Sequence, residues 1–368
     1  MTRTLVALLL FVQIPLAAAT RIRPSRPVHG TPPPAAVVTA ARQAADAALK
    51  AGAPAVQIAV SRGGQVIYSE AFGVTDIASA TPATARSEMQ IGSVTKQFTA
   101  AAILRLAERG QLTLGDRIEK FVPEFDPRGR TITLRNLLNH TSGLARDWYP
   151  PEVPADTTLP VTREHVIKNL NERPFLFAPG KGFSYSNAGY MLLGYAVESI
   201  TGKPYADFIH GEFAVPLGLL DTGVCGTHNL PLPAGYAVFT PSSGPTRMAA
   251  WNRSWLWSSG SLCSTAVDLT RWAHLLGSGV VMQPASYATM KTPAPAAAPY
   301  GFGLVVQDVL GRPAVWHDGA IYGFFTYLVY FSAEDLAVAV NVNAFPAPAT
   351  VNPEGIALAV AKAALESL

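Results

Sequence analysis

The sequence has few charged residues and no cluster of one sign. Lys, Arg, Asp and Glu make up only 14% of the 368 residues, and the formal net charge is +3. Lys and Arg are scattered, without a run of five or more, so no nucleic-acid partner is expected. The hydrophobic content of 49% excludes a disordered chain. It predicts a large buried core, in one domain or in two closely packed ones.

Cysteines and metal-binding patterns are also scarce. No His/Cys cluster has metal-ligand spacing and the H-E-x-x-H pattern is absent, so we expect no metal site. The two cysteines, Cys225 and Cys263, form an even pair, which in an exported chain favours one disulfide. Two buried free thiols are the alternative.

Only one long hydrophobic run occurs, and it lies at the N-terminus. Arg3 precedes the apolar run 5–16, which is shorter than the roughly 20 residues that span a bilayer. Three alanines, residues 17–19, then form a small-residue cleavage site. We therefore predict a signal peptide over residues 1–19 rather than a membrane anchor, and an exported protein, periplasmic or secreted. Residues 20–33 are rich in proline and are predicted to be mobile.

The two ends of the remaining chain have helix and strand patterns, whereas its middle is mostly helical. Gly63-Gly64 separates two β-rich runs and predicts a hairpin. The terminal elements expected from periodicity are helices at 35–50 and 354–366 and strands at 55–62, 65–72, 302–307, 314–317, 324–331 and 336–343. The helices expected in the middle are 93–109, 133–139, 163–171, 188–200 and 265–276.

This order predicts an α/β fold of the α+β type. Residues 34–81 and 291–368 are expected to form one antiparallel sheet flanked by the terminal helices. Residues 82–290 are expected to form a mostly helical domain inserted between the strands.

A serine and a lysine lie one helical turn apart in the stretch IGSVTKQFTAAAILRLAERG, residues 91–110. Ser-x-x-Lys alone is weak evidence, because both residues are common. Here Ser93 begins a helix, where the partial positive charge favours an alkoxide and lowers the pKa of a nearby ammonium, and Lys96 lies on the same face. The following residues are apolar on most faces, as in a buried helix. This favours a nucleophile and its base over an N-cap serine with a surface lysine.

Further sequence blocks follow this motif in a characteristic order. They read TLRNLLNHTSGL, FAPGKGFSYSNAGYMLLG, GSLCSTAVDLTRWA and WHDGAIYGF, and together they extend from Ile91 to Phe324. The blocks resemble the serine β-lactamase and penicillin-binding-protein superfamily, whose signatures begin with S-x-x-K. Tyr185-Ser186-Asn187 is similar to the Tyr-x-Asn element of class C β-lactamases and of related esterases and peptidases. The resemblance implies the β-lactamase/transpeptidase-like fold.

The resemblance also implies a role for each matching residue. Ser93 would be the nucleophile that forms an acyl-enzyme, with Lys96 and Tyr185 sharing the role of base. A tyrosine can act as a base near neutral pH only if adjacent cations lower its pKa, and Lys96 is the expected neighbour. Asn187 would orient the substrate and hold Lys96 in place. His140, in the HTSGL block, would have a structural role in a turn beside the site.

The third signature departs from the superfamily pattern. His317-Asp318-Gly319 stands where many members have Lys-Thr-Gly. Histidine is only fractionally charged near neutral pH, and Asp318 adds a negative charge, so recognition of a substrate carboxylate should weaken. The resemblance implies that the backbone N–H groups of Ser93 and Ala320 bind the oxyanion. Gly319 would lie in an edge strand and, without a side chain, would let other groups come close to that strand.

We therefore predict an exported serine hydrolase without a metal or organic cofactor. Its substrates would be small molecules or peptides, either esters or amides containing D-amino acids. A penicillin-binding β-lactamase or DD-peptidase is the alternative among enzymes. A catalytically silent binding protein of the same fold is the alternative from another class. The presence of the four residues Ser93, Lys96, Tyr185 and Asn187 argues against it.

Overall fold

The computed structural model describes residues 33–149, 156–240 and 244–367. The predicted signal peptide, residues 1–19, lies outside the described residues, and so does the Pro-rich segment 20–33 apart from Pro33. Within the described residues, no helix combines the length and the apolar character needed to cross a membrane.

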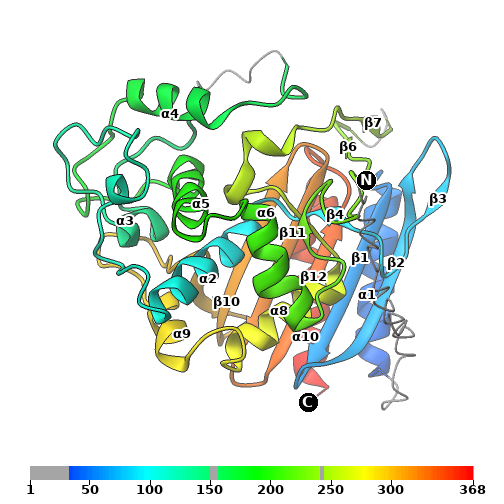
Figure 1. Cartoon of the computed structure of the whole chain (residues 1–368). Helices are drawn as coiled ribbons and strands as arrows, with labels where there is room; N and C mark the ends of the chain where they lie inside the picture. The colour runs from blue at the N-terminus through cyan, green and yellow to red at the C-terminus, as the bar shows by residue number, and fades with distance from the viewer. Residues whose placement is uncertain (1–32, 150–155, 241–243, 368) are drawn as a thin grey trace, which may run out of the picture. The chain divides into compact units, whose positions relative to one another are not determined.

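Seven strands of the described chain form one antiparallel sheet in the order β3-β2-β1-β12-β11-β10-β9 (Figure 1). Their bounds are β1 Ala55–Arg62, β2 Gln65–Asp76, β3 Thr81–Pro82, β9 Val305–Val309, β10 Arg312–Ile321, β11 Phe324–Phe331 and β12 Leu336–Val342. Strands from opposite ends of the chain meet at the centre, where Val56 pairs with Val342. The predicted single sheet built from both ends is confirmed. Gly63 and Gly64, with φ of +56° and +73°, make the predicted hairpin turn.

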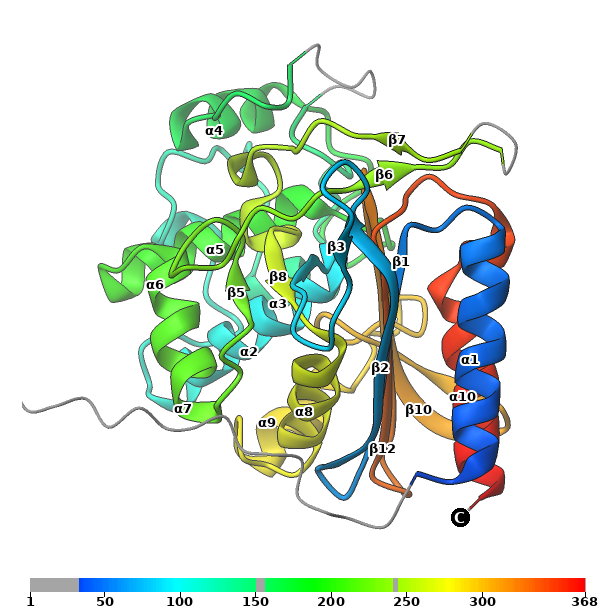
Figure 2. The same cartoon turned by 90° about the vertical axis from the view of Figure 1, so that its right-hand side faces the viewer.

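The terminal helices cover one face of the sheet. Helices α1 (Ala35–Lys50) and α10 (Pro353–Glu366) lie side by side on this face (Figure 2). The residues that they bury are largely alanines, and these pack against buried valines of the sheet such as Val338 and Val340. Because both faces are covered, every residue of β12 is buried, and all of them except Asn341 are apolar.

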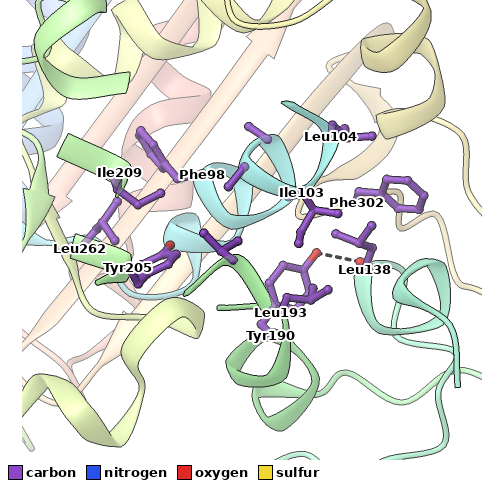
Figure 3. Packing of buried hydrophobic residues seen from close by; sticks show 14 of the residues in the cluster. Phe98, Ile103, Leu104, Leu138, Tyr190, Leu193, Tyr205, Ile209, Leu262 and Phe302 are labelled. Carbon is purple, nitrogen blue, oxygen red and sulfur yellow. Dashed lines mark hydrogen bonds between the residues drawn. The ribbon is translucent and has the colours of Figure 1, made fainter. Parts of the chain in front are cut away.

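The opposite face carries the helices that position the candidate site. They include α2 (Thr95–Glu108), α5 (Asn187–Thr201) and α8 (Ala266–Gly277). Most side chains of α2 are buried, as its apolar sequence predicted. Figure 3 shows Phe98, Ile103 and Leu104 of α2 in this core together with Tyr190 of α5. The Tyr190 hydroxyl donates a hydrogen bond to the Leu138 carbonyl at 2.7 Å and so ties α5 to the neighbouring short helix.

Shorter elements complete the helical part. The helices are α3 Leu134–Leu138, α4 Arg163–Glu172, α6 Tyr205–Ile209, α7 Val215–Leu217 and α9 Pro284–Met290. The 3-10 helices are η1 Gly92–Val94, η2 Ile118–Lys120, η4 Arg253–Trp255, η5 Trp257–Ser259 and η6 Ala349–Val351, and η3 His210–Ala214 is a π-helical turn. The short strands are β4 Met89–Gln90, β5 Gly223–Val224, β6 Tyr236–Ala237, β7 Thr246–Arg247 and β8 Leu262–Ser264.

The two cysteines are joined by a disulfide. Cys263 lies in β8, Cys225 follows β5, and these two short strands pair. The Cα atoms of the two cysteines are 5.0 Å apart, and both residues are buried. The disulfide therefore links two segments that are 38 residues apart in the sequence.

Strand β10 differs from the sequence prediction. It spans Arg312–Ile321, whereas the pattern predicted only 314–317, because Asp318 and Gly319 are poor strand formers by themselves. It is also not the outermost strand, since β9 pairs with its first half, Arg312–Trp316. The description of the Gly319 segment as an edge strand is thus correct only locally. The second half of β10, which contains Gly319, pairs with β11 on one side and packs against η1 on the other.

Candidate active site

Ser93 lies in the turn that leads into the central helix. The sequence predicted that a helix begins at Ser93. Ser93 instead lies in the 3-10 helix η1, which leads directly into α2 at Thr95. Gly92 just before it has φ of +48°, a conformation that favours glycine. Ser93 is thereby held at the N-terminus of a buried helix, where backbone N–H groups supply partial positive charge.

Lys96 is fully buried next to Ser93, with 0% of its surface exposed. Its Nζ lies 3.2 Å from Ser93 Oγ, and it donates hydrogen bonds to Asn187 Oδ1 at 2.7 Å and to the Ser259 carbonyl at 2.8 Å. Burial lowers the pKa of Lys96 well below its ordinary value, and the negative charge of Asp147 only partly opposes this. A neutral amine has two N–H groups for the two carbonyl oxygens and one lone pair for the Ser93 hydroxyl.

Tyr185 lies beside the same lysine, with its ring centroid 4.7 Å from Lys96 Nζ. Burial raises the pKa of Tyr185, and the interaction with the Ser93 side chain acts in the opposite direction with smaller effect. The lowered pKa of Lys96 weakens the cation that was expected to hold Tyr185 as a phenolate. The Tyr185 hydroxyl therefore keeps its proton near neutral pH and is suited to donate it.

Asn187 connects Lys96 to an acidic residue that the sequence motifs did not single out. Its Oδ1 accepts the hydrogen bond from Lys96, and its Nδ2 donates to Asp147 Oδ1 at 2.7 Å. Asn187 is the first residue of α5, whose N-cap, Ser186, accepts a hydrogen bond from the Gly189 N–H. The amide is thus oriented from both sides, and the prediction that Asn187 holds Lys96 agrees with these contacts.

His140 supports the segment that carries Tyr185 and Asn187. Its buried ring accepts a hydrogen bond at Nδ1 from the Ser186 N–H, at 3.0 Å, and lies 4.4 Å from the Tyr185 ring centroid. Burial lowers the pKa of His140 well below its ordinary value, so that the ring is neutral. These contacts agree with the structural role expected for His140.

Two glycines bring the backbone of Ser93 and of Ala320 together. A Cβ atom on Gly319 would lie 1.9 Å from the Ile91 carbonyl oxygen and 3.0 Å from the Ser93 nitrogen. A Cβ atom on Gly92 would lie 2.9 Å from the Ala320 nitrogen. Only glycine at both positions allows this approach, which puts the N–H groups of Ser93 and Ala320 on neighbouring segments. The reason for Gly319 was predicted, whereas that for Gly92 was not.

His317 is buried rather than exposed in the cleft. Tyr300 Oη lies 2.8 Å from its Nε2, and its Nδ1 contacts the carbonyl oxygen of Asp318. Burial lowers the pKa of His317; Asp318 opposes this effect and Lys96 adds to it. A neutral ring with its proton at Nδ1 donates to the Asp318 carbonyl oxygen and accepts a hydrogen bond from the Tyr300 hydroxyl at Nε2. His317 therefore provides no cation for a substrate carboxylate.

A cavity of about 280 Å³ opens beside Ser93. Part of its wall is polar and includes Arg146, Asp147 and Asn187, whereas the rest is largely aromatic or aliphatic and includes Tyr149 and Trp251. Ala320 also lines it. Ser93 and the predicted oxyanion residue therefore face one space that is large enough for a substrate. Within the described residues, no group of three or more His, Cys, Asp or Glu side chains could hold a metal ion.

Known proteins with similar sequences and structures identify the family of this chain. The Beta-lactamase family model matches residues 38–361. The chain belongs to the beta-lactamase family. The predicted superfamily and fold class are thereby confirmed. Among curated members, the chain is 29% identical over 295 residues to penicillin-binding protein 4* of Bacillus subtilis, covering 74% of this chain and 64% of that protein.

Other relatives in the beta-lactamase family carry different names. The chain is 28% identical over 284 residues to the D-aminopeptidase of Brucella anthropi, covering 74% of this chain and 52% of that protein. The chain thus spans less than two-thirds of the length of these curated relatives. A solved structure of D-amino acid amidase from Ochrobactrum anthropi SV3 with L-phenylalanine amide matches the fold with a TM-score of 0.80 at 24% identity, covering 90% of this chain and 99% of that chain.

Several cavity residues of this beta-lactamase-family chain were missed by sequence reasoning. Arg146, Asp147 and Tyr149 closely follow the HTSGL block, and this proximity was the one signal that could have indicated them. Trp251 and Tyr322 belong to distant segments that meet only in the fold. Their positions carry no local pattern that distinguishes them from core aromatics.

Proposed function

We propose that this protein is an exported serine hydrolase that forms an acyl-enzyme on Ser93. Its proposed substrates are amides, peptides or esters in which the acyl group comes from a D-amino acid with a free amino group. The observation that supports this most directly is the environment of Lys96, a fully buried amine with two carbonyl acceptors and the Ser93 hydroxyl as its third neighbour.

In the proposed acylation, the Lys96 lone pair takes the proton of the Ser93 hydroxyl while Ser93 Oγ attacks the substrate carbonyl carbon. The negative charge moves to the carbonyl oxygen, where the N–H groups of Ser93 and Ala320 can stabilise it. The C–N or C–O bond then breaks. The leaving group receives a proton from the Tyr185 hydroxyl, and the Lys96 ammonium returns its proton to Tyr185.

Deacylation repeats these steps with water in place of Ser93. A water molecule gives a proton to Lys96 and attacks the ester carbon of the acyl-enzyme, and Ser93 leaves as the alcohol after receiving that proton. No cofactor is needed for either half-reaction, because each proton that leaves a nucleophile is returned to a leaving group.

The charges around the cavity support the substrate class. Asp147 offers a carboxylate to an ammonium group, and its orientation is fixed by Asn187. His317 is neutral and buried, so the position that holds a lysine in many superfamily members gives no cation. The D series is supported by the names of relatives, the D-aminopeptidase of Brucella anthropi and the D-amino acid amidase of Ochrobactrum anthropi SV3. For export we rely on the N-terminal sequence and the disulfide.

The test compares hydrolysis of D-alanine amide and L-alanine amide by the wild type, Ser93→Ala and Asp147→Asn. Asparagine keeps the hydrogen-bond acceptor for Asn187 but removes the charge. We expect Ser93→Ala to be inactive and Asp147→Asn to lose about 10- to 100-fold in kcat/KM for the D-amide. The burst of p-nitrophenyl acetate, which has no amino group, serves as the control and should change less than about threefold in Asp147→Asn.

Equal activity of the wild type and Ser93→Ala would contradict the mechanism and favour the silent binding protein. An unchanged kcat/KM in Asp147→Asn, or a preference for the L-amide, would contradict the proposed substrate class.

Penicillin recognition is a second candidate, favoured by Arg146 in the same cavity. Its Nε lies 3.7 Å from Asp147 Oδ2, and its exposed guanidinium could also donate hydrogen bonds to a substrate carboxylate. Incubation with a penicillin and measurement of the intact mass separates the two. A persistent adduct on Ser93 would favour a DD-peptidase, and rapid loss of the penicillin would favour a β-lactamase. Neither is expected for a hydrolase of amino acid amides.

A further inference from the structure

We infer that the cavity beside Ser93 selects substrates whose acyl-donating residue has a large aromatic or branched apolar side chain, and that Trp251 and Tyr322 set this preference. The inference rests on the proposed function, because it concerns the substrate class of the same site.

The apolar wall of the cavity is continuous and mainly aromatic. Trp251 stacks on Tyr322 with ring centroids 5.7 Å apart and an angle of 29° between the planes. Tyr149 lies next to Trp251, with a centroid distance of 6.3 Å. Leu256 and Ile321 extend the same wall. A small or polar side chain of the substrate would leave this surface exposed to water. A large apolar side chain would bury both its own surface and that of the wall, which favours binding.

The wall is supported from behind, so that it presents one fixed surface. The buried Trp255 lies 6.1 Å from Trp251 and 5.7 Å from Tyr149, measured between ring centroids. Trp255 itself is fixed by a hydrogen bond from its indole N–H to the Leu159 carbonyl at 2.8 Å. A preorganised pocket binds a rigid aromatic group at small entropic cost.

The position of the wall identifies the part of the substrate that it contacts. Tyr149 is two residues after Asp147, the proposed ammonium ligand, and Tyr322 is two residues after Ala320, a proposed oxyanion donor. The α-carbon of the acyl-donating residue carries both the amino group and the carbonyl group. With these two groups held by Asp147 and Ala320, the side chain on the same carbon lies against the surface between Tyr149 and Tyr322.

The experiment measures kcat/KM for D-phenylalanine amide, D-leucine amide and D-alanine amide with the wild type, Trp251→Ala and Tyr322→Ala. Phe239→Ala is the matched control, because Phe239 is a large aromatic that is 65% exposed and does not line the cavity. Tyr322 is 38% exposed, so its truncation should not impair folding, and thermal unfolding checks both cavity variants.

We expect the wild type to prefer the phenylalanine and leucine amides over the alanine amide by about 10- to 100-fold. Each cavity variant should reduce this ratio at least about fivefold, through a lower kcat/KM for the phenylalanine and leucine amides. Phe239→Ala should leave the ratio unchanged. If all three amides are cleaved equally, or if neither variant alters the ratio, the inference is wrong while the proposed function stands. If none is cleaved, the proposed function fails and the inference fails with it.

Discussion

Replacement of Gly319 by alanine should nearly abolish acylation of Ser93 while leaving the protein folded. The added Cβ would lie 1.9 Å from the Ile91 carbonyl oxygen, whereas a carbon and an oxygen in contact need about 3.2 Å. The β10 backbone must therefore move by about 1 Å away from η1, and the Ala320 N–H moves with it. A displacement of about 1 Å in a catalytic group costs about 100-fold, and loss of one oxyanion donor costs about 100- to 1,000-fold.

The assay is the stopped-flow burst of p-nitrophenol from p-nitrophenyl acetate, with thermal unfolding as the check of folding. We expect the burst rate constant of Gly319→Ala to fall at least about 100-fold. Gly355→Ala is the matched control, because a Cβ at Gly355 in α10 would meet no atom within 4 Å. A folded Gly319→Ala variant with a burst rate constant within threefold of the wild type would refute the role assigned to this close approach.

Three further predictions concern pH and stability. Because burial lowers the pKa of Lys96, the acylation rate should reach its plateau well below pH 10.4, the ordinary lysine value; a rise of tenfold per pH unit up to pH 10 would contradict a neutral Lys96. Burial raises the pKa of the Asp268 carboxyl to about 6, above its unfolded value near 3.9, so its ionisation destabilises the fold as pH rises from about 4 to 6. Asp268→Asn should therefore raise the free energy of unfolding by about 2 to 3 kcal/mol at pH 7 and by little at pH 4, and equal changes at both values in urea titrations would refute this. Replacing Cys225 and Cys263 together by serine removes a link across 38 residues and should lower the free energy of unfolding by about 3 to 4 kcal/mol. Urea titrations measure this change, and a loss below about 1 kcal/mol would contradict the expected contribution of the disulfide.

Periodicity and motif order were sufficient to predict much of this protein. The apolar stretch after Lys96 predicted a buried helix, and α2 is buried on nearly all sides. Gly63-Gly64 predicted a hairpin, and the alternation of helix and strand patterns at the two chain ends predicted one sheet. These features depend on residues close together in the sequence, or on an apolar pattern with the period of a helix or a strand.

Strand β10 shows where local pattern fails. Asp318 and Gly319 are poor strand formers, yet they continue the strand because they pair with Tyr327 and Thr326 of β11. The pairing partner, which follows a turn, outweighs the intrinsic preference of two residues. The same partner fixes Gly319 opposite η1, more than 200 residues earlier in the chain.

The sequence by itself indicated the family, the fold class and the candidate residues Ser93, Lys96 and Tyr185, because motifs in a fixed order restrict the chain to one arrangement. Only the tertiary structure decided in which direction the pKa values of Lys96, Tyr185 and His317 shift, since each depends on how much water distant segments exclude. It also decided the shape of the cavity, where Asp147, Tyr149, Trp251 and Tyr322 meet from separate parts of the chain. The sequence specifies which chemical groups are present, but the burial and the neighbours that set their pKa values arise only when the chain folds.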